Sequence, residues 1–200
     1  MMGMTHVFAG TMSALLLTQP RSTRECLAAL IGGALGAAAC DVDTGRNSHR
    51  MESDRTGRMA CGIILACFLA DGYWNTGLLR GMRSAPTGEM MVGLACLALL
   101  LLWGRCQPHR GGTHSVLMLI LLGLCVKVIC PPASIPTMIG VGSHLVLDLF
   151  NCRPVQLLYP LRGGFCLGLC RADGRMDRLI RNICVLGTVF GLGMSLGGYL

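Results

Sequence analysis

Four histidines and three aspartates of this 200-residue chain lie beside or within apolar stretches, where ionisable side chains are costly and therefore candidates for function. Imidazole and carboxylate are ligands for zinc, and also for manganese or iron. One or two divalent ions, most plausibly zinc, would use a set of this size. The seven candidate ligands are His6, Asp41, Asp43, His109, His114, His144 and Asp148.

Each of these residues also has a structural interpretation when it is considered alone. His6 is a typical interfacial residue, and Asp41 with Asp43 is a typical polar helix end. His144 and Asp148 share one helical face and can form a structural pair. His49 lies in a polar loop and stays outside the predicted site.

The segment from His109 to Ser115 contains two adjacent glycines, which allow a tight turn. Thr113 is a good helix N-cap, and a helix N-terminus favours an anion. Arg110 can hold phosphate oxygens, or it can pair with a metal-bound aspartate. Ser115 lacks a nucleophile-elbow motif, so we interpret it as part of the helix start.

The composition shows which elements must position these side chains. Apolar residues make up 52% of the chain and charged residues 14%, which excludes an ordinary water-soluble surface. The pattern predicts an all-α, polytopic membrane helix bundle with six to seven transmembrane helices, several of them short. The predicted helices cover residues 5–17, 27–40, 59–79, 90–103, 113–130, 135–150 and 182–200.

The net charge of +7 falls between the apolar blocks, and aromatic residues are only 5%, so no nucleic-acid surface is evident. If the helices alternate across the membrane, twelve arginines lie on one side and four on the other, which makes the first side cytoplasmic. Residues 151–181 would form an Arg-rich cytoplasmic segment, which is either an ordinary topology signal or a contact for anionic lipid head groups. All seven candidate ligands fall on that cytoplasmic side.

Three Gly-x-x-x-Gly spacings predict close helix packing: Gly32 with Gly36, Gly187 with Gly191, and Gly193 with Gly197. Asp71 and Lys127 are charges within predicted helices near the opposite side. We expect both to lie at the interface or to snorkel toward it.

The residues Met1 to His6, Asp41-Val42-Asp43, His109 to Ser115, Gly142 to Asp148 and Val155 to Pro160 resemble the successive blocks of the YdjM-like family. Its members are bacterial inner-membrane proteins described as metal-dependent hydrolases. The resemblance covers residues 1 to about 162 and implies the same seven ligands. It also implies a distant relation to zinc-dependent phospholipase C and the P1-type nucleases. Thr44 stands where the family usually has histidine, which argues against a ligand there.

We therefore expect one membrane-embedded domain, residues 1–200, that hydrolyses a phosphoester of a lipid or nucleotide by metal-activated water. Asp43 and Arg110 are the predicted catalytic residues: an aspartate orients or deprotonates the water, and Arg110 steadies negative charge. Two alternatives remain. One is a metal-ion or proton transporter, which needs a polar path across the membrane, and the other is a metal-stabilised structural or regulatory protein without turnover.

Overall fold

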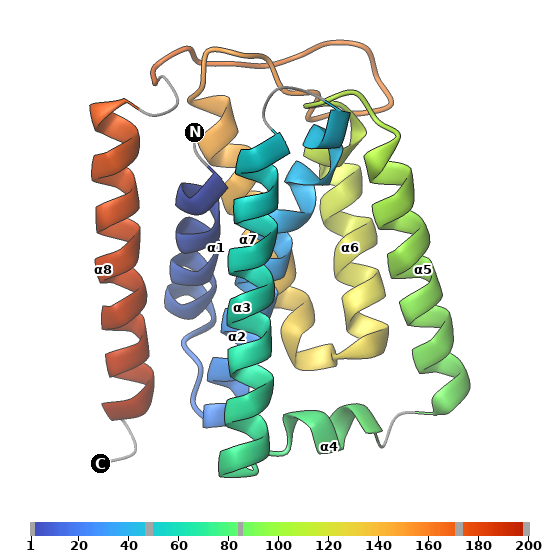
Figure 1. Ribbon diagram of the computed structural model, residues 1–200, viewed down its shortest axis with the longest axis vertical. Helices are drawn as coiled ribbons and strands as arrows, with labels where there is room; N and C mark the ends of the chain where they lie inside the picture. Colours follow the sequence, from blue (N-terminus) through green and yellow to red (C-terminus); the bar gives the residue numbers. More distant parts are fainter. Residues whose placement is uncertain (1–2, 47–49, 84–85, 171–173, 198–200) are drawn as a thin grey trace.

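A computed structural model describes residues 3–46, 50–83, 86–170 and 174–197 of the protein. In these residues the apolar blocks all form helices, which confirms the all-α prediction (Figure 1). The α-helices are α1 (Gly3–Thr18), α2 (Thr23–Ala39), α3 (Arg50–Trp74), α4 (Leu78–Arg83), α5 (Thr87–Arg105), α6 (Val116–Ile129), α7 (Pro131–Leu149) and α8 (Arg175–Gly197). Two short 3-10 helices, η1 (Cys40–Arg46) and η2 (Gly112–His114), lie between them.

Helices α1, α2 and α7 form the centre of the bundle, and glycines bring their backbones close together. A Cβ at Gly33 of α2 would lie 2.6 Å from the carbonyl oxygen of Gly10 on α1. A Cβ at Gly140 of α7 would lie 2.6 Å from the carbonyl oxygen of Gly33. The predicted packing role of Gly32 and Gly36 is therefore confirmed, because both face the α7 backbone.

The other predicted glycine pairs behave differently from each other. Gly187 and Gly191 of α8 lie against Met12 and Leu15 of α1, so this spacing does join two helices. Gly193 faces open space, with no atom within 4 Å of a Cβ placed there.

The outer helices expose large apolar side chains, as expected for helices that face lipid. Examples are Leu65 on α3, Leu99 on α5 and Val189 on α8, each at least 60% exposed. Within the described residues, two segments are long and apolar enough to cross a membrane, Thr23–Asp43 and Thr87–Arg105. The predicted count of six to seven spans is not confirmed, because α6, for example, has only 14 residues where a span needs about 20.

Helix α3 ends earlier than the predicted boundary at residue 79. Asn75 and Gly77 adopt positive φ angles of 52° and 86°, which terminate the helix. The carboxylate of Asp71 then accepts hydrogen bonds from the backbone amides of Leu78 and Leu79 at the start of α4. The Asp71 side chain is thus buried against the start of α4, a contact that was not predicted.

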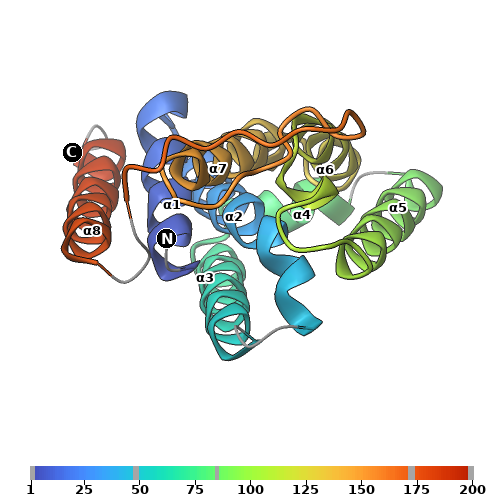
Figure 2. The same ribbon diagram turned by 90° about the horizontal axis from the view of Figure 1, so that it is seen from above.

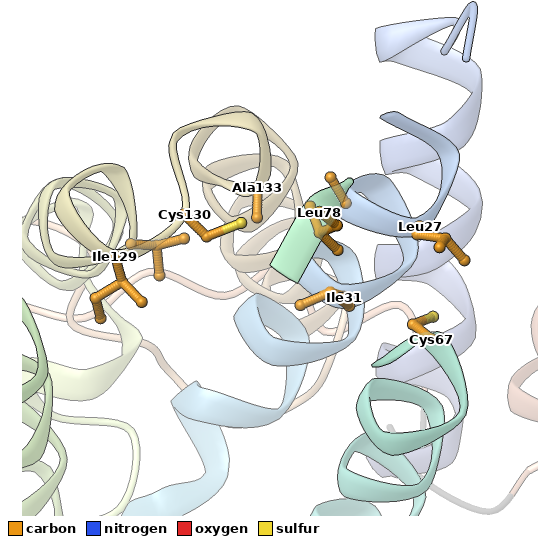
Figure 3. Close-up of a cluster of buried hydrophobic side chains, with 9 residues drawn as sticks. Leu27, Ile31, Cys67, Leu78, Ile129, Cys130 and Ala133 are labelled. Carbon is orange, nitrogen blue, oxygen red and sulfur yellow. The ribbon is translucent and has the colours of Figure 1, made fainter. Parts of the chain in front are cut away.

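An apolar cluster closes the end of the bundle that contains α4 (Figure 3). Leu78 of α4 belongs to this cluster together with Ile31 of α2 and Ile129 of α6. The chain N-terminus, η1, η2 and the starts of α3 and α8 lie at the other end (Figure 1). Because α2 and α7 run in the opposite direction to α1, the first residues of α1 lie at the same end as the last residues of α2 and α7.

Candidate metal centre

All seven predicted ligands meet at the end of the bundle opposite α4. His6 lies on α1, while His144 and Asp148 lie on the last turns of α7. Asp41 and Asp43 lie on η1, directly after α2. His109 precedes η2, and His114 is its last residue.

Four of these side chains converge on one small volume. The Nε2 atoms of His114 and His144 are 3.3 Å apart. The Oδ2 atom of Asp148 lies 3.4 Å from the first nitrogen and 3.8 Å from the second. The Oδ1 atom of Asp41 lies 3.9 Å and 3.7 Å from the same two nitrogens. Two tetrahedral zinc ligands with bonds of about 2.0 to 2.1 Å would lie about 3.3 to 3.4 Å apart, so the shortest of these distances match a metal site.

Hydrogen bonds determine which nitrogen of each histidine faces this volume. Nδ1 of His144 lies 2.7 Å from the carbonyl oxygen of Ala37, which can only accept, so Nδ1 carries the proton. The Thr113 hydroxyl donates to Asp43, and it therefore accepts from Nδ1 of His114 at 3.0 Å. In neutral rings both Nε2 atoms then present lone pairs to each other, an arrangement that requires a cation between them.

A proton on His114 would also supply a cation at this position. Burial lowers the pKa of His114, but its hydrogen bond to Asp43 and the charges of the three aspartates outweigh burial and raise that pKa above its usual value. A bound metal ion would displace this proton.

Asp43 lies behind His114 in a network of donors. Its Oδ1 is 2.8 Å from Nδ1 of His109, and its Oδ2 accepts from the backbone amide of Arg110 at 3.0 Å. Oδ2 also accepts from the Thr113 hydroxyl and lies 3.3 Å from Nδ1 of His114. The carboxylate is fully buried, and it orients the imidazole of His114.

Arg110 and His6 surround Asp148. Nη2 of Arg110 lies 3.2 Å from Oδ1 of Asp148, and Nη1 donates to the carbonyl oxygen of Arg153 at 2.7 Å. Nε2 of His6 is 3.5 Å from the same Asp148 oxygen, and its ring stacks on His144 at 3.9 Å between centroids. Among the described residues, Nδ1 of His6 is buried without a hydrogen-bond partner.

Three overlapping groups of these side chains are placed to hold a metal ion. The groups are His6 with His144 and Asp148, Asp41 with His114 and His144, and Asp43 with His109 and His114. Asp41 and His109 are the most exposed members, with side chains 16% and 20% exposed. The side chains of the other five are at most 3% exposed.

Two contacts of the centre were not predicted. The Ala37 carbonyl carries no sequence signal, because any residue offers one. Thr113 was predicted as a helix cap, but Ser115 caps α6 by accepting from the amide of Met118. The position of Thr113 directly before His114 was the available clue, since metal-ligating histidines commonly have a partner for their other nitrogen.

Comparison with known proteins supports the membrane assignment. Residues 1–195 match the family described as YdjM inner membrane protein. The "Uncharacterized protein YvsG" of Bacillus subtilis (strain 168) is 35% identical over 54 residues, which is 26% of this chain and 34% of that relative. The match thus spans about a third of that relative's length. No solved structure matches the chain.

Proposed function

The chain belongs to the family of the YdjM inner membrane protein, and from this premise we propose that it is a membrane-bound, metal-dependent hydrolase acting on a phosphoester. The observation that carries the proposal is the convergence of two Nε2 lone pairs and two carboxylates beside the exposed edge of Asp41. Zinc is the ion that we propose, because the donors are nitrogen and carboxylate oxygen at nearly tetrahedral spacing.

A bound zinc ion would supply hydroxide near neutral pH and polarise a phosphoryl oxygen. His114, His144 and Asp148 are the residues that would hold it, and the Asp41 carboxylate lies beside them. His6 lies against both His144 and Asp148, and it would complete a second ligand group if two ions bind.

We assign different roles to the two aspartates of η1. Both oxygens of Asp43 already contact His109, Thr113 or the Arg110 amide, so Asp43 orients His114 and is poorly placed to take a proton. Asp41 is the more exposed of the two, and we propose that its carboxylate accepts the proton of the attacking water.

A phosphoester fits the charge around the entrance. The largely buried Arg110 forms an ion pair with Asp148, and the exposed Arg105 and Arg153 add positive charge at the same end of the bundle. Such a field favours an anionic substrate and stabilises charge that develops on its oxygens.

The far end of the bundle weighs against transport. The cluster in Figure 3 fills the described interior there with apolar side chains such as Ile31, Leu78 and Ile129. Its members include the thiols of Cys67 and Cys130 but no carboxylate or imidazole. The carboxylate of Asp71 is already bonded to the backbone of α4. A site at one end fits this interior better than a path through it.

Metal content and turnover of the purified protein test the proposal together. We expect stoichiometric zinc in the wild-type chain and hydrolysis of phosphoesters, and we expect both to be lost in His114→Ala and in Asp148→Asn. Asp54→Asn, which changes an exposed carboxylate of α3, is the matched control and should retain both. Metal without turnover on any lipid or nucleotide phosphoester would leave a structural role, and a wild-type protein without metal would refute the hydrolase.

A further inference from the structure

Residues 152–169 form an irregular segment that crosses the ends of α7 and α6 on the outside of the metal centre (Figure 2). Most of their large apolar side chains are exposed. Each of the following is at least half exposed: Leu158, Leu161, Phe165, Leu167 and Leu169. Five large apolar side chains exposed on one short segment indicate an interaction site.

The segment is held in this orientation by its backbone. Val155 is fully buried in the cluster with Met118 and Leu145. The amide of Val116 donates to the carbonyl of Leu157 at 3.0 Å, and the amide of Leu167 donates to the carbonyl of Leu149 at 2.7 Å. With the backbone bound to the helix ends, the exposed side chains have no place in the bundle interior.

The surroundings indicate what covers this surface. Arg153 and Arg162 are exposed on the segment itself, and Arg105, Arg175 and Arg178 are exposed on the adjoining helix ends. Leu102 of α5 and Leu179 of α8, near the same end of the bundle, are also exposed. Apolar side chains mixed with arginine, next to the outer surface of a membrane bundle, are typical of the boundary between lipid head groups and acyl chains.

We propose that residues 152–169 lie in the head-group layer of the membrane that the protein spans, with their apolar side chains among the acyl chains and their arginines on anionic phospholipid phosphates. The carbonyl of Arg153 holds Arg110, which in turn holds Asp148, so this contact adjoins the metal centre. The substrate that follows is a phospholipid of that leaflet, with its phosphoester at the depth of the centre. This last step rests on the proposed function.

Photo-cross-linking of the wild-type protein tests the membrane contact without depending on turnover. The full chain is reconstituted with a phospholipid that carries a diazirine in its acyl chain, and adducts are mapped by mass spectrometry. We expect adducts on residues 158–169 and on the lipid-facing Leu99, but none on the buried Leu122. Adducts on Leu99 without any on residues 158–169 would overturn the proposal. In that case a second copy of the chain or a soluble partner would cover the segment in place of lipid.

Two substitutions on the segment then test the substrate class. In Leu161→Asn/Leu169→Asn, we expect adducts on the segment and turnover of vesicle phospholipid to fall by about fivefold or more, since less apolar surface is inserted. Metal content and turnover of a soluble short-chain phosphodiester should stay at the wild-type level. Equal turnover of vesicle lipid by wild type and variant would refute the lipid substrate, whereas absence of turnover on both substrates in the wild type would refute the hydrolase and leave the cross-linking result intact.

Discussion

Replacing Gly33 by alanine places a methyl group where α1 and α2 touch through their backbones. The new Cβ would lie 2.6 Å from the Gly10 carbonyl oxygen and 2.9 Å from the Thr11 Cα, and neither backbone atom can rotate away. Two non-bonded heavy atoms in ordinary contact lie about 3.5 Å apart, so the two helices must separate by about 1 Å.

The expected loss of stability follows from two opposing effects. Overpacking costs about 1 to 3 kcal/mol, and the higher helix propensity of alanine offsets about 0.5 to 1 kcal/mol of it. The midpoints of these ranges leave a net loss of about 1.3 kcal/mol, which should lower the Tm by about 3 to 5 °C for a chain of this size.

The same separation should reach the metal centre. Helix α1 carries His6, and α2 both supplies the Ala37 carbonyl that orients His144 and leads into Asp41. Metal sites tolerate errors of only about 0.2 Å in ligand distance, so we expect the zinc Kd to rise at least about tenfold.

The assay is thermal unfolding in detergent together with zinc titration against a competing chelator. Gly62→Ala on α3 is the matched control, because a Cβ there meets nothing within 4 Å, and it should leave both values unchanged or raise the Tm slightly. If Gly33→Ala matched Gly62→Ala in Tm and in zinc affinity, the close α1–α2 contact and its link to the centre would both be refuted.

Three further predictions concern the ligands and the metal. Thr113→Val removes the hydroxyl between Asp43 and His114, so the zinc Kd should rise about 10- to 100-fold in chelator competition, whereas Thr113→Ser should keep the wild-type value. Chelation should lower the Tm of the wild type, because it removes about 2.7 kcal/mol of stabilisation if zinc was present at a hundred times its Kd. It should leave the Tm of His114→Ala unchanged. Because the pKa of His114 is raised, zinc must displace its proton, so zinc affinity should fall as the pH is lowered; a Kd that does not change with pH would contradict this arrangement.

Much of this protein could be predicted from local sequence features. A helix was found at every predicted apolar block. Each block favours a helix because backbone hydrogen bonds are then satisfied within the segment itself. Alternation of direction then placed His6, Asp41, His114 and Asp148 at one end, since each lies at the matching end of its helix. The i, i+4 spacing of His144 and Asp148 put both on one face of α7.

Other features depended on contacts between segments far apart in the chain. The tautomer of His144 depends on the Ala37 carbonyl, 107 residues away, and the orientation of His114 depends on Asp43. The early end of α3 reflects the bonds from Asp71 to α4, which no helical period encodes.

The sequence by itself thus determined the helices, the membrane class and the residue types of the centre, because hydrophobicity and periodicity are local properties. Only the tertiary structure decided that four of the seven side chains converge, that Asp43 stands behind His114, and that residues 152–169 present leucines outward. Those outcomes depend on hydrogen bonds and packing distances in three dimensions, and a change of about 1 Å between helices is enough to alter them.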